Sequence, residues 1–171
     1  MRQLICMFWE ICLLRGTPRE LPRSPVLLGL VVALGLVIDN INLGFAVPAA
    51  SAVQVAGAVL VHTGLLAGSL AGLLALTGYA ARVVQTLTAL IGSGLILSLI
   101  AMPLIMLSGL SGQLALVLAV LLVILNIWSL LVTMHILRHA LSINRILAGL
   151  LAAGYYLLSL MVIERLLPGS A

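Results

Sequence analysis

Long apolar runs, separated by short polar segments, make up almost all of the chain after residue 24. A run of about 20 apolar residues is long enough to cross the hydrocarbon core of a bilayer as a helix. We therefore predict an all-α polytopic integral membrane protein in which residues 25–171 form one five-helix transmembrane domain. Residues 111–113 are expected to form a tight turn, and Pro168 to stop the last helix. The predicted spans are residues 25–45, 52–77, 86–110, 114–137 and 146–167.

Residues 1–24 follow a different pattern and are predicted to lie on the cytoplasmic side. Within the first fifteen positions, four residues share one narrow helical face: Arg2, Gln3, Cys6 and Glu10. This run is too short to span a membrane, so the pattern predicts a short amphipathic interfacial helix. No small-residue cleavage site follows, and we expect the segment to be retained. The prolines within residues 17–24 favour an extended surface linker, and Ser24-Pro25 then provides an N-cap and a proline at the first helical position.

The composition supports the membrane assignment and suggests an orientation. Hydrophobic residues make up 64% of the chain and charged residues 7%, whereas a soluble domain is about 45–50% apolar and about 25% charged. With the amino terminus in the cytoplasm, seven of the eight arginines fall on that side and only Arg165 on the other. Because positive charge near short loops marks the cytoplasmic side, we predict a cytoplasmic amino terminus and a carboxyl terminus on the other side, in the periplasm or lumen. No basic run lies on a soluble surface, so no nucleic-acid partner is expected.

Three glycines and one asparagine inside the spans predict how the helices pack. The second span carries three glycines four residues apart, Gly64, Gly68 and Gly72. Helices in lipid associate where small residues let their backbones approach. We expect this glycine ridge to organise the bundle by packing against another helix, with a specific dimer or a lipid groove as the alternatives. Asn126, near the middle of the fourth span, is predicted to hydrogen-bond between helices.

Ionisable groups inside the membrane are costly and therefore mark candidate functional sites. Asp39 lies about 20 Å above the inner end of its span, and His62 lies about 10–15 Å below the outer face, so the two could meet at similar depth. With Asn40 and Asn42 they form a candidate intramembrane polar site, suited to relaying protons or coordinating a substrate. Alternatively, the first span ends near Ile38, and Asp39 lies at the wet outer interface.

The remaining histidines give no metal or haem site. His135 and His139 are four residues apart, but no third ligand converges on them, and His135 lies more than about 10 Å in depth from His62, too far for one haem. Nothing resembles a nucleophile elbow, a phosphate loop or a zincin helix, so we expect neither an enzyme nor a cofactor. A juxtamembrane role facing anionic lipid headgroups is predicted for four residues: Arg82, Arg138, His139 and Arg145.

Three short stretches resemble Yip1-like membrane proteins. Residues 82–92 (RVVQTLTALIG) are similar to the family's F-x-Q-T-L entry into a span. Trp128 with residues 135–140 (HILRHA) resembles the family's Trp and the loop after it, and residues 13–24 look like those of a small bacterial branch. The resemblance implies an architecture more than an activity. The family's eukaryotic members are membrane-trafficking factors that bind Rab-type GTPases and shape membranes.

Two functions follow from these patterns. We expect a non-enzymatic membrane scaffold or membrane-organising protein, whose partners are membrane lipids and either other membrane proteins or further copies of the chain. The alternative is a small proton- or ion-linked transporter or channel subunit that uses Asp39 and His62. No inverted repeat with paired broken helices, the usual pointer to a transport site, is visible in the sequence.

Overall fold

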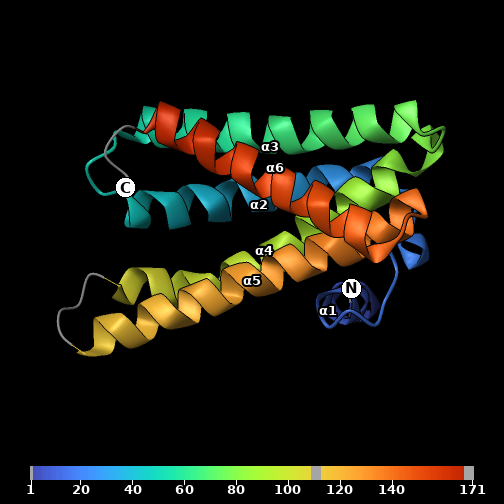
Figure 1. Cartoon of the computed structure of the whole chain (residues 1–171). Helices are drawn as coiled ribbons and strands as arrows, with labels where there is room; N and C mark the ends of the chain where they lie inside the picture. Colours follow the sequence, from blue (N-terminus) through green and yellow to red (C-terminus); the bar gives the residue numbers. More distant parts are fainter. Residues whose placement is uncertain (1, 109–112, 168–171) are drawn as a thin grey trace.

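The computed structural model describes residues 2–108 and 113–167, and there the chain is a bundle of helices joined by short turns. Within these residues, five helices are long and apolar enough to cross a membrane, which confirms the predicted all-α polytopic fold. They run side by side, whereas a shorter helix lies across them near one end of the bundle (Figure 1). The helices are α1 (Arg2–Cys12), α2 (Pro25–Ala46), α3 (Ala52–Leu76), α4 (Val83–Leu107), α5 (Gln113–Leu141) and α6 (Arg145–Leu166).

The helix ends differ from the predicted spans mainly in α4 and α5. Helix α4 begins at Val83, directly after the 3₁₀ turn Ala80–Arg82, and not at residue 86. Helix α5 continues to Leu141, so Arg138 and His139 lie in its last turn and not in the loop where the sequence placed them. The end of the third predicted span (109–110), most of the predicted turn and the Pro168 stop lie outside the described residues.

Helix α4 is the element on which most of the bundle packs. It contacts α1, α2, α3 and α5, and its pairing with α2 is the most extensive of the bundle. Its buried face carries short polar side chains that bond to their own helix. The hydroxyls of Thr86, Thr88 and Ser93 donate to the carbonyls four residues earlier, at 2.9, 2.7 and 2.7 Å. Because their polar groups are satisfied locally, these residues allow close packing without unpaired donors.

The glycine ridge of α3 does not organise the bundle. Gly64, Gly68 and Gly72 are exposed, and a Cβ added at any of them would meet no described atom within 4 Å. The prediction that the ridge packs against another helix of this chain is therefore wrong. Helix α3 instead turns its bulkier face toward the bundle: Val55, Ala58, Val59, Leu70 and Leu74 are its buried residues.

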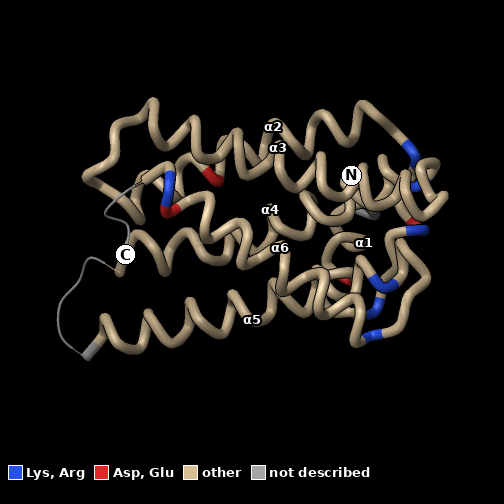
Figure 2. Tube along the Cα trace, turned by 45° about the horizontal axis from the view of Figure 1, so that its top comes forward, with Lys and Arg blue, Asp and Glu red and all other residues tan. Residues whose placement is uncertain are grey.

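The hydrophobic core occupies one half of the bundle, toward the end where most arginines lie (Figure 2). Leu74, Ile136 and Ala148 come from three different helices, and none of them exposes any of its surface. We call the arginines at this end the arginine cluster: Arg15, Arg19, Arg23, Arg82, Arg138 and Arg145. Arg165 lies at the opposite end, next to Glu164.

The segment between α1 and α2 is not the extended surface linker that its prolines predicted. It contains a 3₁₀ turn, Pro18–Glu20, that packs against α4 and α5, and Leu21 after it is 1% exposed. Gln85 of α4 holds this segment: its Nε2 donates to the Leu21 carbonyl at 2.7 Å, and its Oε1 accepts from Arg23 Nε at 3.1 Å. A polar side chain on the central helix therefore fixes the linker to the bundle.

Two residues of the arginine cluster bind the carboxyl end of α5. Arg19 donates to the His139 carbonyl at 3.2 Å, and Arg82 donates to the Ala140 carbonyl at 3.0 Å. Cations at a helix carboxyl terminus satisfy its free carbonyls and favour the helix dipole. The Arg82 guanidinium also lies 4.4 Å from the centre of the Tyr79 ring. Arg82 therefore binds groups of the protein itself, whereas Arg145 is exposed, and the lipid-facing role of these residues stays a prediction.

Helix α1 is fixed to α4 and α5 by one apolar contact and two polar ones. The Phe8 ring lies directly over Gly92, where no Cβ occupies the space. Trp128 Nε1 donates to the Cys12 carbonyl at 2.9 Å, and the Cys12 thiol donates to the Ser93 carbonyl at 3.7 Å. Burial raises the pKa of the Cys12 thiol to about 11. At neutral pH this thiol is protonated and therefore a poor nucleophile.

Gly92→Ala tests whether this glycine fixes α1. A Cβ at residue 92 would overlap the Phe8 ring, so we expect the variant to be less stable by about 1–3 kcal/mol, as in other overpacked cores. Gly94→Ala is the matched control, because it lies on the same helix and its Cβ would meet no described atom within 4 Å. Thermal unfolding in detergent measures both. In a Phe8→Ala background, Gly92→Ala should cause little further loss, and equal stability of the two single glycine variants would contradict the contact.

Candidate functional site

A cavity of about 470 Å³ lies among α2, α3, α4, α5 and α6, and it extends from the middle of the bundle to the end away from the arginine cluster. It reaches Ala46, Ile105 and Ile163, close to the far ends of their helices. Toward the arginine cluster it reaches Val32, Leu90 and Thr133, and there it ends among residues of the hydrophobic core, such as Leu90 and Ala152. We describe it as a vestibule, because it is closed at the core and extends toward the opposite end of the bundle.

One wall of the vestibule brings α2 and α4 together through polar side chains. Ser98 Oγ donates to Asp39 Oδ1 at 2.9 Å, and Asn42 Nδ2 donates to the Ser98 carbonyl at 2.9 Å. Asp39 and Asn42 are three residues apart, so they lie on the same face of α2. Asn42 is 8% exposed, and its Oδ1 has no hydrogen-bond partner among the described residues. This wall therefore holds a carboxylate and an unfilled buried acceptor.

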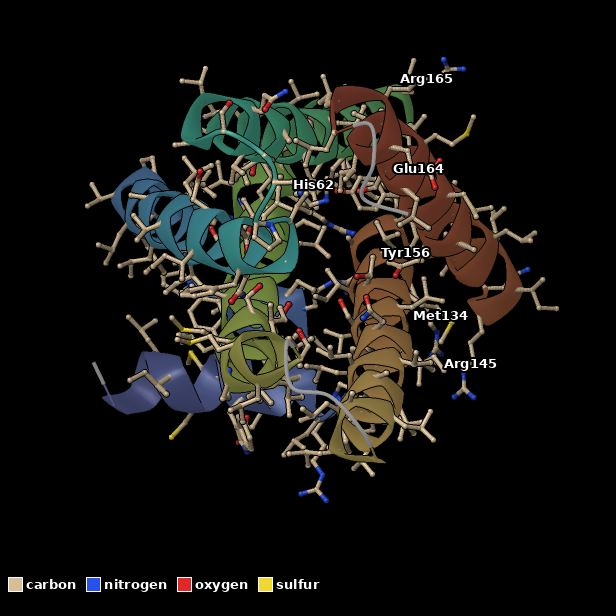
Figure 3. All side chains as sticks on the ribbon, turned by 90° about the vertical axis from the view of Figure 1, so that its left-hand side faces the viewer. His62, Met134, Arg145, Tyr156, Glu164 and Arg165 are labelled. Atoms are coloured by element: carbon tan, nitrogen blue, oxygen red, sulfur yellow. The ribbon has the colours of Figure 1, made fainter. Side chains whose placement is uncertain are left out.

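The opposite wall is made by α3, α5 and α6. The Tyr155 hydroxyl lies 3.0 Å from His62 Nε2. The Tyr156 hydroxyl donates to Asn126 Oδ1 at 2.9 Å, which links α6 to α5. Seen from the end away from the core, His62 and Tyr156 point toward the space between the helices, whereas Arg145 points away from it (Figure 3).

The structure brings together most of the predicted intramembrane polar residues. Asp39, Asn42 and His62 all line the vestibule. Asp39 and His62 face the same space, but each hydrogen-bonds to another residue, so they do not form a direct pair. Asn40 lies outside the lining and donates to the Leu36 carbonyl of its own helix at 2.7 Å. Helix α2 does not end near Ile38 but continues to Ala46, while the alternative that Asp39 lies at the wet outer interface stays a prediction.

Sequence reasoning did not assign Ser98, Tyr155 or Tyr156 to this site. The two tyrosines lie near the middle of α6, whereas tyrosines in membrane proteins concentrate at the two interfaces. That position was a signal of an intramembrane polar role. Ser98 gave no such signal, because a serine in a span usually bonds only to its own helix.

The histidines near the arginine cluster belong to a different region. The rings of His135 and His139 lie 4.6 Å apart, and His135 Nε2 lies 3.0 Å from the Gly16 carbonyl. Among residues 2–108 and 113–167, no group of three His, Cys, Asp or Glu side chains is placed to hold a metal ion. His135 therefore contributes to holding the end of the α1 segment, outside the vestibule.

No protein-family model, curated protein or solved structure matches the chain. The Yip1-like resemblance thus stays a prediction that rests on its short motifs. The structure does give physical roles to two residues of those motifs. Gln85 holds the linker, and Trp128 holds the end of α1.

Thiol labelling tests whether the vestibule admits water from the end opposite the arginine cluster. Ser129 lines the cavity, whereas Val123, on the same helix, is exposed on the outer face of the bundle. In a Cys6→Ser background, Cys12 stays protonated at neutral pH, because its pKa is about 11. We expect a membrane-impermeant maleimide added from that side to label Ser129→Cys at least tenfold faster than Val123→Cys, which lipid covers. Equal rates would contradict an aqueous vestibule.

Proposed function

We propose that the protein is a small proton- or ion-linked transporter or channel subunit, and that the vestibule is part of its solute path. The observation that supports this most directly is Asp39, a carboxylate that lines an intramembrane cavity with no Lys or Arg among the described lining residues. Burying a charge without a partner is expensive, and such groups in membrane proteins mark ion and proton pathways.

The arrangement of the polar groups favours transport over a purely structural role. Structural polar residues in a membrane find partners within the protein, as Thr86, Thr88 and Ser93 do by donating to backbone carbonyls four residues earlier. The vestibule instead keeps unfilled hydrogen-bonding capacity at Asn42. Its volume of about 470 Å³ also falls in the range of small-molecule sites, about 300–1,000 Å³.

The proposed orientation places the vestibule on the periplasmic side of a bacterial inner membrane. The arginine cluster marks the cytoplasmic end by the positive-inside rule, together with the amino terminus. The carboxyl terminus then lies in the periplasm. In this orientation, the packed core is the cytoplasmic barrier that a transported solute or ion must pass.

A second candidate function is the membrane scaffold, as implied by the Yip1-like resemblance. It is supported by the glycine ridge of α3, because Gly64, Gly68 and Gly72 are covered by no described part of the chain. Such a surface suits close approach by another transmembrane helix, either from a second copy or from another membrane protein. Lipid tails are the alternative neighbours of this surface.

Proton flux in reconstituted vesicles tests the transport proposal. The vesicles contain a pH-sensitive dye, and a potassium gradient with valinomycin imposes the membrane potential. We expect potential-driven proton uptake above that of protein-free vesicles, and a loss of at least tenfold in Asp39→Asn. Glu164→Gln is the matched control, because Glu164 is exposed and does not line the vestibule. Uptake equal to that of protein-free vesicles, or an unchanged rate in Asp39→Asn, would contradict the proposal.

Gly68→Leu tests the scaffold candidate. If the ridge binds another helix, a leucine there blocks the approach, and the complex isolated in mild detergent should fall to the mass of a single chain. Gly29→Leu is the control, since Gly29 is also exposed with no described atom within 4 Å of an added Cβ but lies on α2. Mass determined by light scattering measures the outcome. A complex of unchanged mass in Gly68→Leu would exclude the ridge as the interface.

A further inference from the structure

We propose that the vestibule binds a small organic cation, whose protonated amine lies between Asp39, Asn42 and Ser98 and whose apolar body fills the remaining space. This inference rests on the proposed function and adds the chemical class of the solute. It follows from three properties of the described lining: its charge, its unfilled hydrogen-bond acceptors and its size.

The charge of the lining favours a cation. Asp39 on α2 is its only acid among the described residues, and no Lys or Arg lines it from any of the five helices. The other titratable side chains are His62 on α3 and the two tyrosines on α6. His62 Nε2 lies 3.0 Å from the Tyr155 hydroxyl, and among the described residues the side chain that hydrogen-bonds to Asp39 is Ser98, not His62. A bound cation would supply the missing positive charge.

On the wall formed by α2 and α4, the hydrogen-bonding groups that remain unused are acceptors. An ammonium group has three donors and no acceptor, whereas an ionised carboxylate offers about four lone pairs. Only one hydrogen bond to Asp39 is made by the described residues, from Ser98. Asn42 Nδ2 donates to the Ser98 carbonyl, and this bond sets the orientation of the amide, because a flipped amide would place two acceptors together. Asn42 Oδ1 is thereby left as a second acceptor without a donor.

The size and lining of the vestibule favour an organic cation over a bare metal ion. An alkali ion needs only a few oxygen atoms around it, whereas the cavity measures about 470 Å³ and is lined mainly by aliphatic side chains. Sites of this type hold a small molecule through apolar contacts and use a few polar groups to fix its orientation. The rings of Tyr155 and Tyr156 also line the space, and aromatic faces attract organic cations.

Binding measurements with a matched pair of probes test the inference. Phenethylamine is protonated at neutral pH, and 2-phenylethanol has the same shape without the charge. With the purified protein in detergent, calorimetry at pH 7 should detect saturable binding of phenethylamine, at least tenfold tighter than that of 2-phenylethanol. Asp39→Asn should weaken amine binding at least tenfold, while Glu164→Gln should leave it unchanged, because Glu164 does not line the vestibule.

Several results would overturn the inference. These are equal binding of the two probes, unchanged amine binding in Asp39→Asn, or binding of sodium chloride without binding of the amine. If Asp39→Asn fails to fold, as judged by gel filtration and circular dichroism, Asn42→Leu replaces it. That variant removes the free acceptor and should weaken amine binding at least fivefold, and an unchanged affinity would equally overturn the proposal.

The same measurements separate this inference from the proposed function. Calorimetry needs no ion gradient, so amine binding without proton uptake in vesicles would keep the cation site and reject ion-linked transport. Proton uptake that depends on Asp39, without amine binding, would keep the transport proposal and reject the organic cation.

Discussion

The hydrocarbon environment favours structures in which the polar groups of a span find partners inside the protein, and the packing of this chain depends on how that requirement is met. In α4 it is met locally: Thr86, Thr88 and Ser93 bond to their own helix and leave a compact surface for its neighbours. At the end of α5, the exposed carbonyls are bound by arginines from other segments. Close packing around α4 is possible because no donor there is left unpaired.

The same requirement is met differently in the two halves of the bundle. Toward the arginine cluster, Leu74, Ile136 and Ala148 are fully buried between the helices. From the middle of the bundle to the opposite end, polar side chains from α2, α3, α4, α5 and α6 line a vestibule. The interior of the bundle is therefore apolar and packed toward one end and polar toward the other. A scaffold that only holds helices together does not need this difference. This asymmetry is the physical basis for placing solute binding ahead of a structural role.

The two glycine sites show why a small-residue pattern alone does not locate a contact. Gly64, Gly68 and Gly72 form the most regular pattern in the sequence, yet nothing described in the chain covers them. Gly92 belongs to no such pattern, and it is the glycine directly against which an aromatic ring packs. A glycine permits close approach, but which surface is approached depends on the rotation of each helix in the bundle, and rotation is set by all the neighbours at once.

The sequence by itself determined the all-α class, the five spans to within a few residues, and the concentration of arginines at one end. These features follow from local rules, because bilayer thickness fixes the length of an apolar run and a helix satisfies its own backbone. The sequence also identified Asp39, Asn42 and His62 as candidates, since polar residues in spans are conspicuous. Only the tertiary structure decided their partners, Ser98 and Tyr155, and left Asn42 Oδ1 unpaired. Partner choice depends on which faces of distant helices meet, and no local pattern specifies that.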